Sequence, residues 1–197
     1  EKGFNVDCMD LMADEIRVFK KNALVLGVSD KIEQSSWKEI PANYPKEHYD
    51  FLFCRGNSFI YANGGWNAGQ IVNPTESLEA YQRTLQSFYD TIRRQGHLYI
   101  DKFPDNEKPH YEVVGKVIVG NSIEDLIFYT RRFPDQNYRE AKMIRRKPEG
   151  EETGVLNKTY DLKEEELESL LSKVGFSQVN RLNLTQEKTF NVWLAQK

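Results

Sequence analysis

The sequence predicts an α/β fold with a mostly parallel sheet, an antiparallel hairpin at its C-terminal end and an inserted layer of antiparallel strands. Three observations predict it. Strand-like and helix-like segments alternate over residues 3–101, alternating patterns separated by turns fill residues 110–160, and two strand-like runs follow a last helix. Alternating strands and helices are typical of a parallel sheet with helices on both faces. We expect one domain over residues 1–197, with residues 110–160 as the inserted layer.

The chain has 197 residues, of which 39% are hydrophobic, and a formal net charge of -3. A charge so near neutrality argues against broad electrostatic binding to nucleic acid or to an anionic membrane. No apolar run reaches the roughly 20 residues that cross a bilayer, and the first residues lack a signal-peptide pattern. Two cysteines without paired spacing predict reduced thiols in a cytoplasmic protein. The histidines have no ligand spacing, so we expect no metal site. The sequence leaves open whether the chain forms a homo-oligomer.

In the first part of the chain, Gly3–Val6 predicts the tail of a strand that ends at Asp7. A helix is expected over residues 11–22, because apolar side chains recur on one of its faces. These side chains are Met12, Ile16 and Phe19. Residues 38–48 contain two prolines and mixed polar residues, and predict a loop.

The middle of the chain holds the clearest strand and helix signals. Tyr49–Cys54 predicts a buried strand, which the polar residues 55–58 break abruptly. Asn73 can cap a helix whose first residue is a proline and whose third is a glutamate. We expect that helix to end at Gly96 and a second buried strand to follow at Leu98–Asp101.

The last part of the chain changes to shorter alternating runs. Four antiparallel strands are expected, over residues 113–119, 123–132, 138–146 and 155–160. Asp161 and Glu164 then form a capping pair that starts a helix, and Gly175 ends it. Two closing strands are expected over residues 176–182 and 189–195.

Polar residues lie where three of these strands end, and open α/β sheets bind ligands at the carboxyl ends of their strands. Asp7 is well placed to accept hydrogen bonds from a ribose diol; a solvated loop carboxylate is the alternative. Trp37, which follows Ser36, can cover an adenine ring, although a half-buried core tryptophan is nearly as plausible. Asp101 ends the third strand.

The turn after the Tyr49–Cys54 strand offers the second part of a site. Gly56 lets a ligand approach the backbone closely. Asn57 then presents both a donor and an acceptor to a small polar substrate. An ordinary turn is the alternative, because Gly and Asn are common in turns.

At these residues the chain resembles the class I S-adenosylmethionine-dependent methyltransferases, and among them the glycine/sarcosine N-methyltransferase group. Val6-Asp7, with Met12 five residues past the Asp, is similar to that family's second-strand motif, and Ser36-Trp37 falls where the group has an Asn-Trp pair. Gly56-Asn57-Ser58-Phe59 is similar to the group's fourth-strand motif. Residues 94–98 resemble the turn into the fifth strand, and Phe128-Tyr129-Thr130 resembles an inserted strand that carries a substrate-binding tyrosine.

The resemblance implies a Rossmann-like sheet, S-adenosyl-L-methionine (SAM) as cofactor, and N-methylation of a small amine or amino acid. It implies that the cofactor is bound by Asp7 at the ribose, by Ser36 and Trp37 at the adenine, and by Arg55 through its backbone. It also implies that Asn57 and Tyr129 bind the substrate. A non-catalytic binding or interaction module on a degenerate methyltransferase fold is the alternative, and a nicotinamide-dependent dehydrogenase fits the closing hairpin poorly.

The sequence departs from that family in two places. Nothing corresponds to the family's glycine-rich first motif, so we expect the domain to be incomplete at its N-terminus. Where the family has Asp-His-Arg, with the arginine on the amino-acid carboxylate, this chain has Asp101-Lys102-Phe103. Two explanations stay open. Arg55 takes over the carboxylate, or the acceptor lacks one and meets aromatic side chains instead. Those side chains are Phe103, Tyr61 and Tyr129.

Overall fold

The structure is a computed structural model in which seven stretches of the chain are described. They are residues 6–10, 13–27, 31–63, 71–105, 108–119, 122–187 and 189–197. The strand tail expected from Gly3 to Asn5 and the side chain of Met12 therefore lie outside the described residues. The chain forms two compact units, Glu1–Lys46 and Glu47–Lys197, and each is described by itself.

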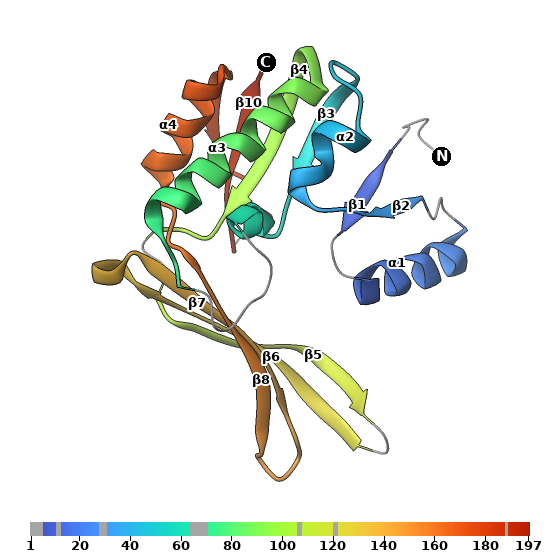
Figure 1. Cartoon of the computed structure of the whole chain (residues 1–197). Coiled ribbons are helices and arrows are strands. Elements are labelled where there is room, and N and C mark those ends of the chain that lie inside the picture. The colour runs from blue at the N-terminus through green and yellow to red at the C-terminus, as the bar shows by residue number, and fades with distance from the viewer. Residues whose placement is uncertain are drawn as a thin grey trace. The chain divides into compact units, whose positions relative to one another are not determined.

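The smaller unit is a strand–helix–strand segment followed by short helices (Figure 1). Strand β1 (Cys8–Asp10) runs parallel to β2 (Ile32–Gln34), and helix α1 (Ala13–Leu26) connects them. The 3-10 helix η1 (Trp37–Glu39) and helix α2 (Ile40–Asn43) follow where a loop was expected.

The prediction that Asp7 ends a strand is wrong in this structure. The backbone that pairs with β2 is Cys8–Asp10, so Asp7 precedes the strand and Asp10 ends it. Helix α1 also continues past the expected end at Asn22, and its last residues Leu24–Leu26 carry exposed apolar side chains. Apolar periodicity does not mark this helix end, because these side chains are not packed.

The larger unit contains a four-stranded sheet in the order β3-β4-β10-β9. Its strands are β3 (Tyr49–Cys54), β4 (Ile92–Lys102), β9 (Ser177–Leu182) and β10 (Asn191–Gln196). Strands β3 and β4 are parallel, whereas β10 is antiparallel to both of its neighbours. Strands β3, β4 and β9 therefore run in the same direction and β10 runs against them, so the described strands show the expected mostly parallel sheet with a C-terminal antiparallel hairpin.

Two helices cover one face of that sheet, α3 (Pro74–Thr91) and α4 (Glu164–Val174) (Figure 1). Asn73 caps α3 by accepting hydrogen bonds from the N–H groups of Thr75 and Glu76, as expected. Gly175 ends α4 in the left-handed conformation, also as expected. The core between helices and sheet is made of fully buried apolar side chains. Among them are Leu85, Phe88, Ile100, Leu167 and Trp193.

Helix α3 ends at Thr91 and not at Gly96, which lies inside β4. Gly96 is needed for strand packing, because a Cβ atom there would lie 2.9 Å from the carbonyl oxygen of Asp50 on β3. The glycine that predicted a helix end therefore permits the close approach of two parallel strands.

The inserted segment forms a second four-stranded sheet, antiparallel throughout and in the order β5-β6-β7-β8. Its strands are β5 (His110–Val119), β6 (Ser122–Phe133), β7 (Tyr138–Arg146) and β8 (Glu152–Tyr160). The antiparallel strands expected from the sequence are present. This sheet lies beyond the end at which β3 and β4 finish (Figure 1). None of the helices in the described stretches has an apolar segment long enough to span a bilayer.

Candidate active site at the ends of the parallel strands

The turn after β3 is fixed by a buried carboxylate at the end of β4. Gly56 and Asn57 both have positive φ angles, of 77° and 57°. Their N–H groups donate hydrogen bonds to the carboxylate of Asp101, at 3.1 and 2.7 Å. Asp101 is 1% exposed, and burial raises the pKa of its carboxyl, while the bonds from Asn57 and Gly56 oppose that shift. The polar groups predicted at the ends of these two strands are therefore in contact.

Positive φ at Gly56 gives a testable prediction. No described atom lies within 4 Å of a Cβ atom built there, so Gly56→Ala meets backbone strain and no steric clash. We expect this substitution to lower the free energy of unfolding by about 1 kcal/mol, measured by urea denaturation. Gly115→Ala is the matched control, because that glycine also has open space but no positive φ. Equal effects of the two substitutions would contradict the assignment of strain.

The side chain of Asn57 points into the protein. It is 4% exposed, and its Oδ1 atom accepts a hydrogen bond from the N–H of Phe103 at 3.4 Å. Asn57 therefore connects the turn after β3 to the residue that follows β4. Its carboxamide oxygen is therefore engaged with Phe103 and is not open to a ligand.

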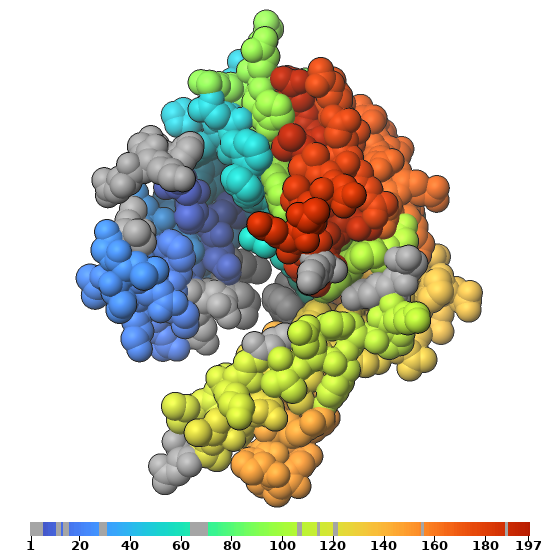
Figure 2. Space-filling view, turned by 180° about the vertical axis from the view of Figure 1, so that it is seen from behind, coloured from blue at the N-terminus to red at the C-terminus, as the bar shows by residue number. Residues whose placement is uncertain are grey.

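Phe103 joins the two sheets of the larger unit. Its ring stacks on that of Phe128 in β6 with centroids 5.9 Å apart, and it contacts the ring of Phe190 at 4.8 Å. The guanidinium carbon of Arg139 in β7 lies 4.8 Å from the centroid of the Phe103 ring. Figure 2 shows the C-terminal segment (red) and the second sheet (yellow-green) on one face of this unit.

Tyr129, predicted as a substrate ligand, lies on the opposite face of β6 from Phe128. Strand β6 pairs with β7 without a register shift, so its side chains alternate between the two faces. Phe128 faces Phe103, and Tyr129 therefore points away from Phe103 and Asn57. Phe128 and Tyr129 are adjacent in sequence and therefore lie on opposite faces of the sheet. No feature of the local sequence shows which of the two faces Phe103.

An ion-pair cluster anchors the second sheet beside Phe103. Arg132 in β6 donates from Nε to both oxygens of the Asp161 carboxylate at 2.9 Å, and from a terminal nitrogen at 2.7 Å. Lys163 donates to the same carboxylate at 2.6 Å, and Arg139 lies at 3.7 Å. Burial alone would raise the pKa of Asp161, but Arg132 and Lys163 outweigh it, and the pKa is lowered. Asp161 therefore carries its negative charge against several cations.

Arg55 is already paired with a carboxylate. Its side chain is 68% exposed and lies 3.2 Å from Glu187, in the turn between β9 and β10. Glu187 in turn accepts hydrogen bonds from the N–H groups of Thr189 and Phe190. A pocket of about 420 Å³ lies at this turn, with Glu187 and Phe190 among its lining residues. The pairing weakens the hypothesis that Arg55 binds the carboxylate of an amino acid.

In the smaller unit, the predicted nucleoside ligands lie at the two ends of one strand pair. Ser36 and Trp37 follow β2, and the N–H of Ser35 donates to the carbonyl of Asp10 at 2.9 Å. Asp7 lies at the other end of β1 and is exposed. The hydroxyl and N–H of Ser36 both donate to Glu39, at 2.9 and 2.7 Å. The hydroxyl of Ser36 is thus engaged in starting η1.

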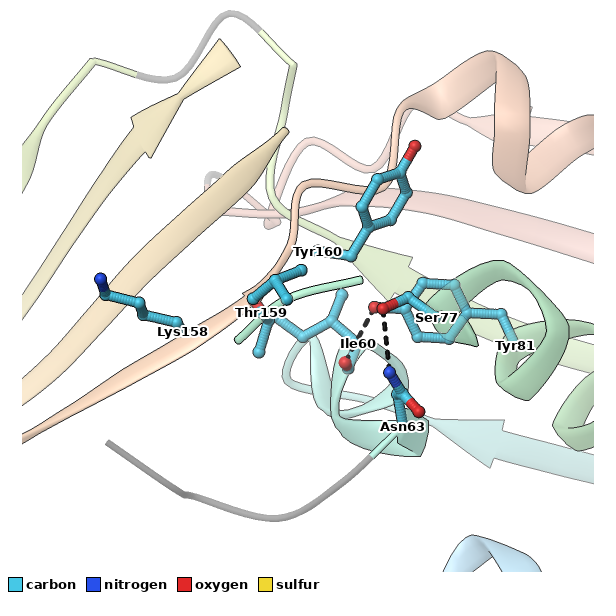
Figure 3. Close-up of a pocket in the computed structure, with 8 residues that line it drawn as sticks. Ile60, Asn63, Ser77, Tyr81, Lys158, Thr159 and Tyr160 are labelled. Atoms are coloured by element: carbon cyan, nitrogen blue, oxygen red, sulfur yellow. Dashed lines mark hydrogen bonds between the residues drawn. The ribbon is translucent and has the colours of Figure 1, made fainter. Parts of the chain in front are cut away.

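A small cavity lies between η2 (Ser58–Asn63), helix α3 and the end of β8 (Figure 3). Asn63 donates to the hydroxyl of Ser77 at 3.0 Å, and the hydroxyl of Tyr81 donates to the carbonyl of Ile60 at 3.0 Å. The cavity volume is about 10 Å³, which holds a single water at most. This cavity is a gap in the packing that holds η2 on α3, and not a substrate pocket.

No protein-family model matches the sequence, and no curated protein is similar to it in sequence. Solved structures do match. A SAM-dependent methyltransferase from Clostridium acetobutylicum aligns with a TM-score of 0.64 at 10% identity, over 98% of this chain and 75% of that one. The SAM-bound amino pentose methyltransferase CalS10 from Micromonospora echinaspora gives 0.63 at 10% identity, over 98% and 73%. The sugar N-methyltransferase KedS8 from Streptoalloteichus gives 0.61 at 12% identity, over 96% and 69%.

This chain has a methyltransferase fold. At identities this low the likeness establishes the fold alone. The α/β class expected from the sequence is therefore confirmed, and the expected sheet arrangement is confirmed in part. The comparisons give no support to the glycine/sarcosine group in particular.

Proposed function

We propose that this chain is a SAM-dependent methyltransferase that N-methylates a small amine. One observation carries the proposal. On a methyltransferase fold, the parallel strand β3 ends in a turn through Gly56 and Asn57, and the buried carboxylate of Asp101 holds that turn. A rigid turn at the carboxyl ends of parallel strands is where open α/β sheets bind their ligands.

The turn fits the methionine part of the cofactor. The N–H groups of Gly56 and Asn57 point at Asp101. The groups that the turn presents to a ligand are therefore carbonyl oxygens, among them that of Arg55. A carbonyl oxygen accepts hydrogen bonds from an ammonium group. The space beside Gly56 is open among the described residues. We assign the contact with the ammonium group of SAM to the backbone of Arg55.

The nucleoside part of SAM is assigned to the smaller unit. The exposed carboxylate of Asp7 can accept hydrogen bonds from a ribose diol. Asp10 is the alternative ribose ligand, because it lies at the end of the strand pair that Ser36 and Trp37 follow. Trp37 is half-buried, so part of its indole ring is available to stack on adenine. Ser36 fixes the start of η1 and thereby positions Trp37.

SAM would supply a methyl group on a sulfonium. A neutral amine would attack that methyl carbon as the carbon–sulfur bond breaks, with S-adenosylhomocysteine as the leaving group and loss of a proton from the methylated amine. The protein has to orient that amine, exclude water and keep it unprotonated. Half-buried Phe128 supplies apolar surface for this. The buried ring of Phe103 supports it from behind, and Asn57 holds Phe103 in place. Phe128 replaces Tyr129 in the proposal, because Tyr129 lies on the other face of β6.

The acceptor is proposed to lack a carboxylate. Phe103 occupies the position where the resembled family has its carboxylate-binding arginine, and it is buried among aromatic rings. Arg55 pairs with Glu187. Both observations disfavour glycine or sarcosine. Sugar amines, the class named for two of the structural neighbours, meet this condition.

The alternative, a non-catalytic module on the same fold, predicts that SAM does not bind. Titration of the intact protein with tritiated SAM separates the two. We expect binding, followed by transfer of label to a small amine. Absence of SAM binding at millimolar concentration would reject the enzyme.

Asp7→Ala is expected to weaken SAM binding to the intact protein by about 1.5–3 kcal/mol, the scale of a hydrogen bond to a charged group. The measurement is the dissociation constant of SAM by calorimetry. Asp10→Ala is the control, because Asp10 is half-buried and ends β1. A larger loss of affinity from Asp10→Ala would move the ribose contact to that residue.

A further inference from the structure

Two buried polar side chains lie in one row across the second sheet. Thr130 in β6 and Asn157 in β8 both pair with Ala141 in β7, one from each side. Residues paired across neighbouring strands point to the same face of a sheet. Thr130 is 0% exposed and Asn157 is 2% exposed. The row therefore presents a hydroxyl and a carboxamide on one face, with the methyl group of Ala141 between them.

These polar groups have no hydrogen-bond partner in the described part of the chain. The Oγ1 atom of Thr130 and both the Oδ1 and Nδ2 atoms of Asn157 are buried and unpaired there. Buried polar side chains in native proteins are nearly always paired, and an unpaired one requires an explanation. Apolar residues of the same shape would fill these positions without that cost. These atoms have almost no accessible surface in this structure, so a ligand that completes their hydrogen bonds has to displace a side chain that covers them.

The row lies on the face of the second sheet that meets the candidate site. Phe128 is two residues from Thr130 on the same strand, so it shares that face and stacks on Phe103. Arg139 is two residues from Ala141 and lies over the ring of Phe103. Phe103 donates to Asn57 in the turn after β3. The unpaired groups thus belong to the layer that faces the proposed acceptor side.

The arginines on this face already contact a carboxylate. Arg132 and Arg139 both lie against the carboxylate of Asp161. A carboxylate or phosphate ligand would compete with Asp161 for them. The unpaired groups are neutral, and each can both donate and accept a hydrogen bond. A hydroxyl group has the same dual capacity, and so does an amide.

We propose that Thr130 and Asn157 bind the hydroxyl groups of the methyl acceptor, so that the acceptor is a hydroxylated amine. The identification of the ligand as the methyl acceptor rests on the proposed function. The hydrogen-bonding site itself rests on the two side chains.

The test uses two primary amines of similar size, glucosamine, which carries hydroxyl groups, and cyclohexylamine, which carries none. Ligand-observed NMR measures the dissociation constant of each for the intact protein. We expect glucosamine to bind at least tenfold more tightly than cyclohexylamine. Thr130→Val and Asn157→Leu should each raise the dissociation constant of glucosamine by tenfold or more, and leave that of cyclohexylamine unchanged. Equal binding of the two amines by the unsubstituted protein would overturn the proposal.

Stability distinguishes a ligand site from a structural one. Thr130→Val and Asn157→Leu remove unpaired groups, so we expect melting temperatures no lower than that of the unsubstituted protein. Thr91→Val is the matched control, because its buried hydroxyl donates to the carbonyls of Ser87 and Phe88 at 2.6 and 3.1 Å. It should lower the melting temperature and leave glucosamine binding unchanged. If Thr130→Val and Asn157→Leu behave like Thr91→Val, the row has a structural role and the proposal fails.

The same samples separate this inference from the proposed function. If the protein does not bind SAM, but binds glucosamine in a way that depends on Thr130 and Asn157, the methyltransferase function is rejected and the hydroxyl-binding site is supported. If SAM binding and amine methylation are unchanged by both substitutions, the methyltransferase function is supported and the hydroxyl-binding site is rejected.

Discussion

Asp161→Asn is expected to lower the free energy of unfolding by about 3–5 kcal/mol, the range for removing one partner of a buried ion pair. The carboxylate of Asp161 is buried and accepts a two-pronged contact from Arg132, with Lys163 and Arg139 beside it. An asparagine keeps the shape but not the charge. Arg132 and Arg139, both mostly buried, would then lack a counter-ion. The expected loss is largely the cost of that uncompensated positive charge.

The pH dependence of this effect follows from the direction of the pKa shift. The pKa of Asp161 is lowered in the folded protein, so the unfolded chain binds the proton more readily. The carboxylate therefore contributes stability above the unfolded value of about 3.9, and that contribution is lost as the pH falls through the lower folded value. The stability difference between the unsubstituted protein and Asp161→Asn should narrow below about pH 4.

Urea denaturation at neutral and acid pH measures both effects. Glu151→Gln is the control, because Glu151 forms an exposed ion pair with Lys147. An exposed pair contributes about 0–1 kcal/mol. If Asp161→Asn costs no more than Glu151→Gln, the cluster beside Phe103 is not an anchor for the second sheet.

Local sequence was sufficient for the elements whose signals are local. Asn73 and Gly175 mark helix ends by capping, and the structure has helix ends there. The Tyr49–Cys54 strand has the predicted bounds. These predictions succeed because a cap or a short apolar run acts on its own few residues.

Elements that depend on packing against distant residues were not predictable in detail. Gly96 looks like a helix end, yet the close approach of β3 requires it inside β4. Asp7 looks like the end of a strand, yet the pairing with β2 begins one residue later. The position of β10 between β4 and β9 likewise depends on a sheet order that residue patterns do not specify.

In the candidate site, too, some contacts follow from the sequence and others depend on the pairing of distant strands. That Asp101 and Asn57 meet follows from their positions after two neighbouring parallel strands, and the structure confirms it. The choice between Phe128 and Tyr129 depends on which face of β6 each occupies. That face is set by the register of a whole sheet. Thr130 and Asn157 are 27 positions apart, as their numbers give, and only the strand pairing reveals that they share a row.

Asp101→Ala is expected to lower the free energy of unfolding by about 3 kcal/mol and to weaken SAM binding to the intact protein. The substitution removes the acceptor of two charge-assisted hydrogen bonds, each with a typical strength of about 1.5–3 kcal/mol. The buried N–H of Asn57 would be left unpaired. Relief from burying a carboxylate offsets part of the loss.

The larger consequence of Asp101→Ala is for the shape of the turn. Gly56 and Asn57 both hold positive φ angles, and for Asn57 that conformation has to be maintained by its surroundings. Without Asp101 the two N–H groups lose their orientation, and the carbonyl of Arg55 loses its fixed direction. Asp50→Ala is the control, since Asp50 is an exposed aspartate on β3 that pairs with Arg93. We expect it to change neither stability nor SAM affinity by more than about 1 kcal/mol. If Asp101→Ala lowers stability but leaves SAM affinity intact, the turn is part of the core alone, and the assignment of the Arg55 backbone to the cofactor is wrong.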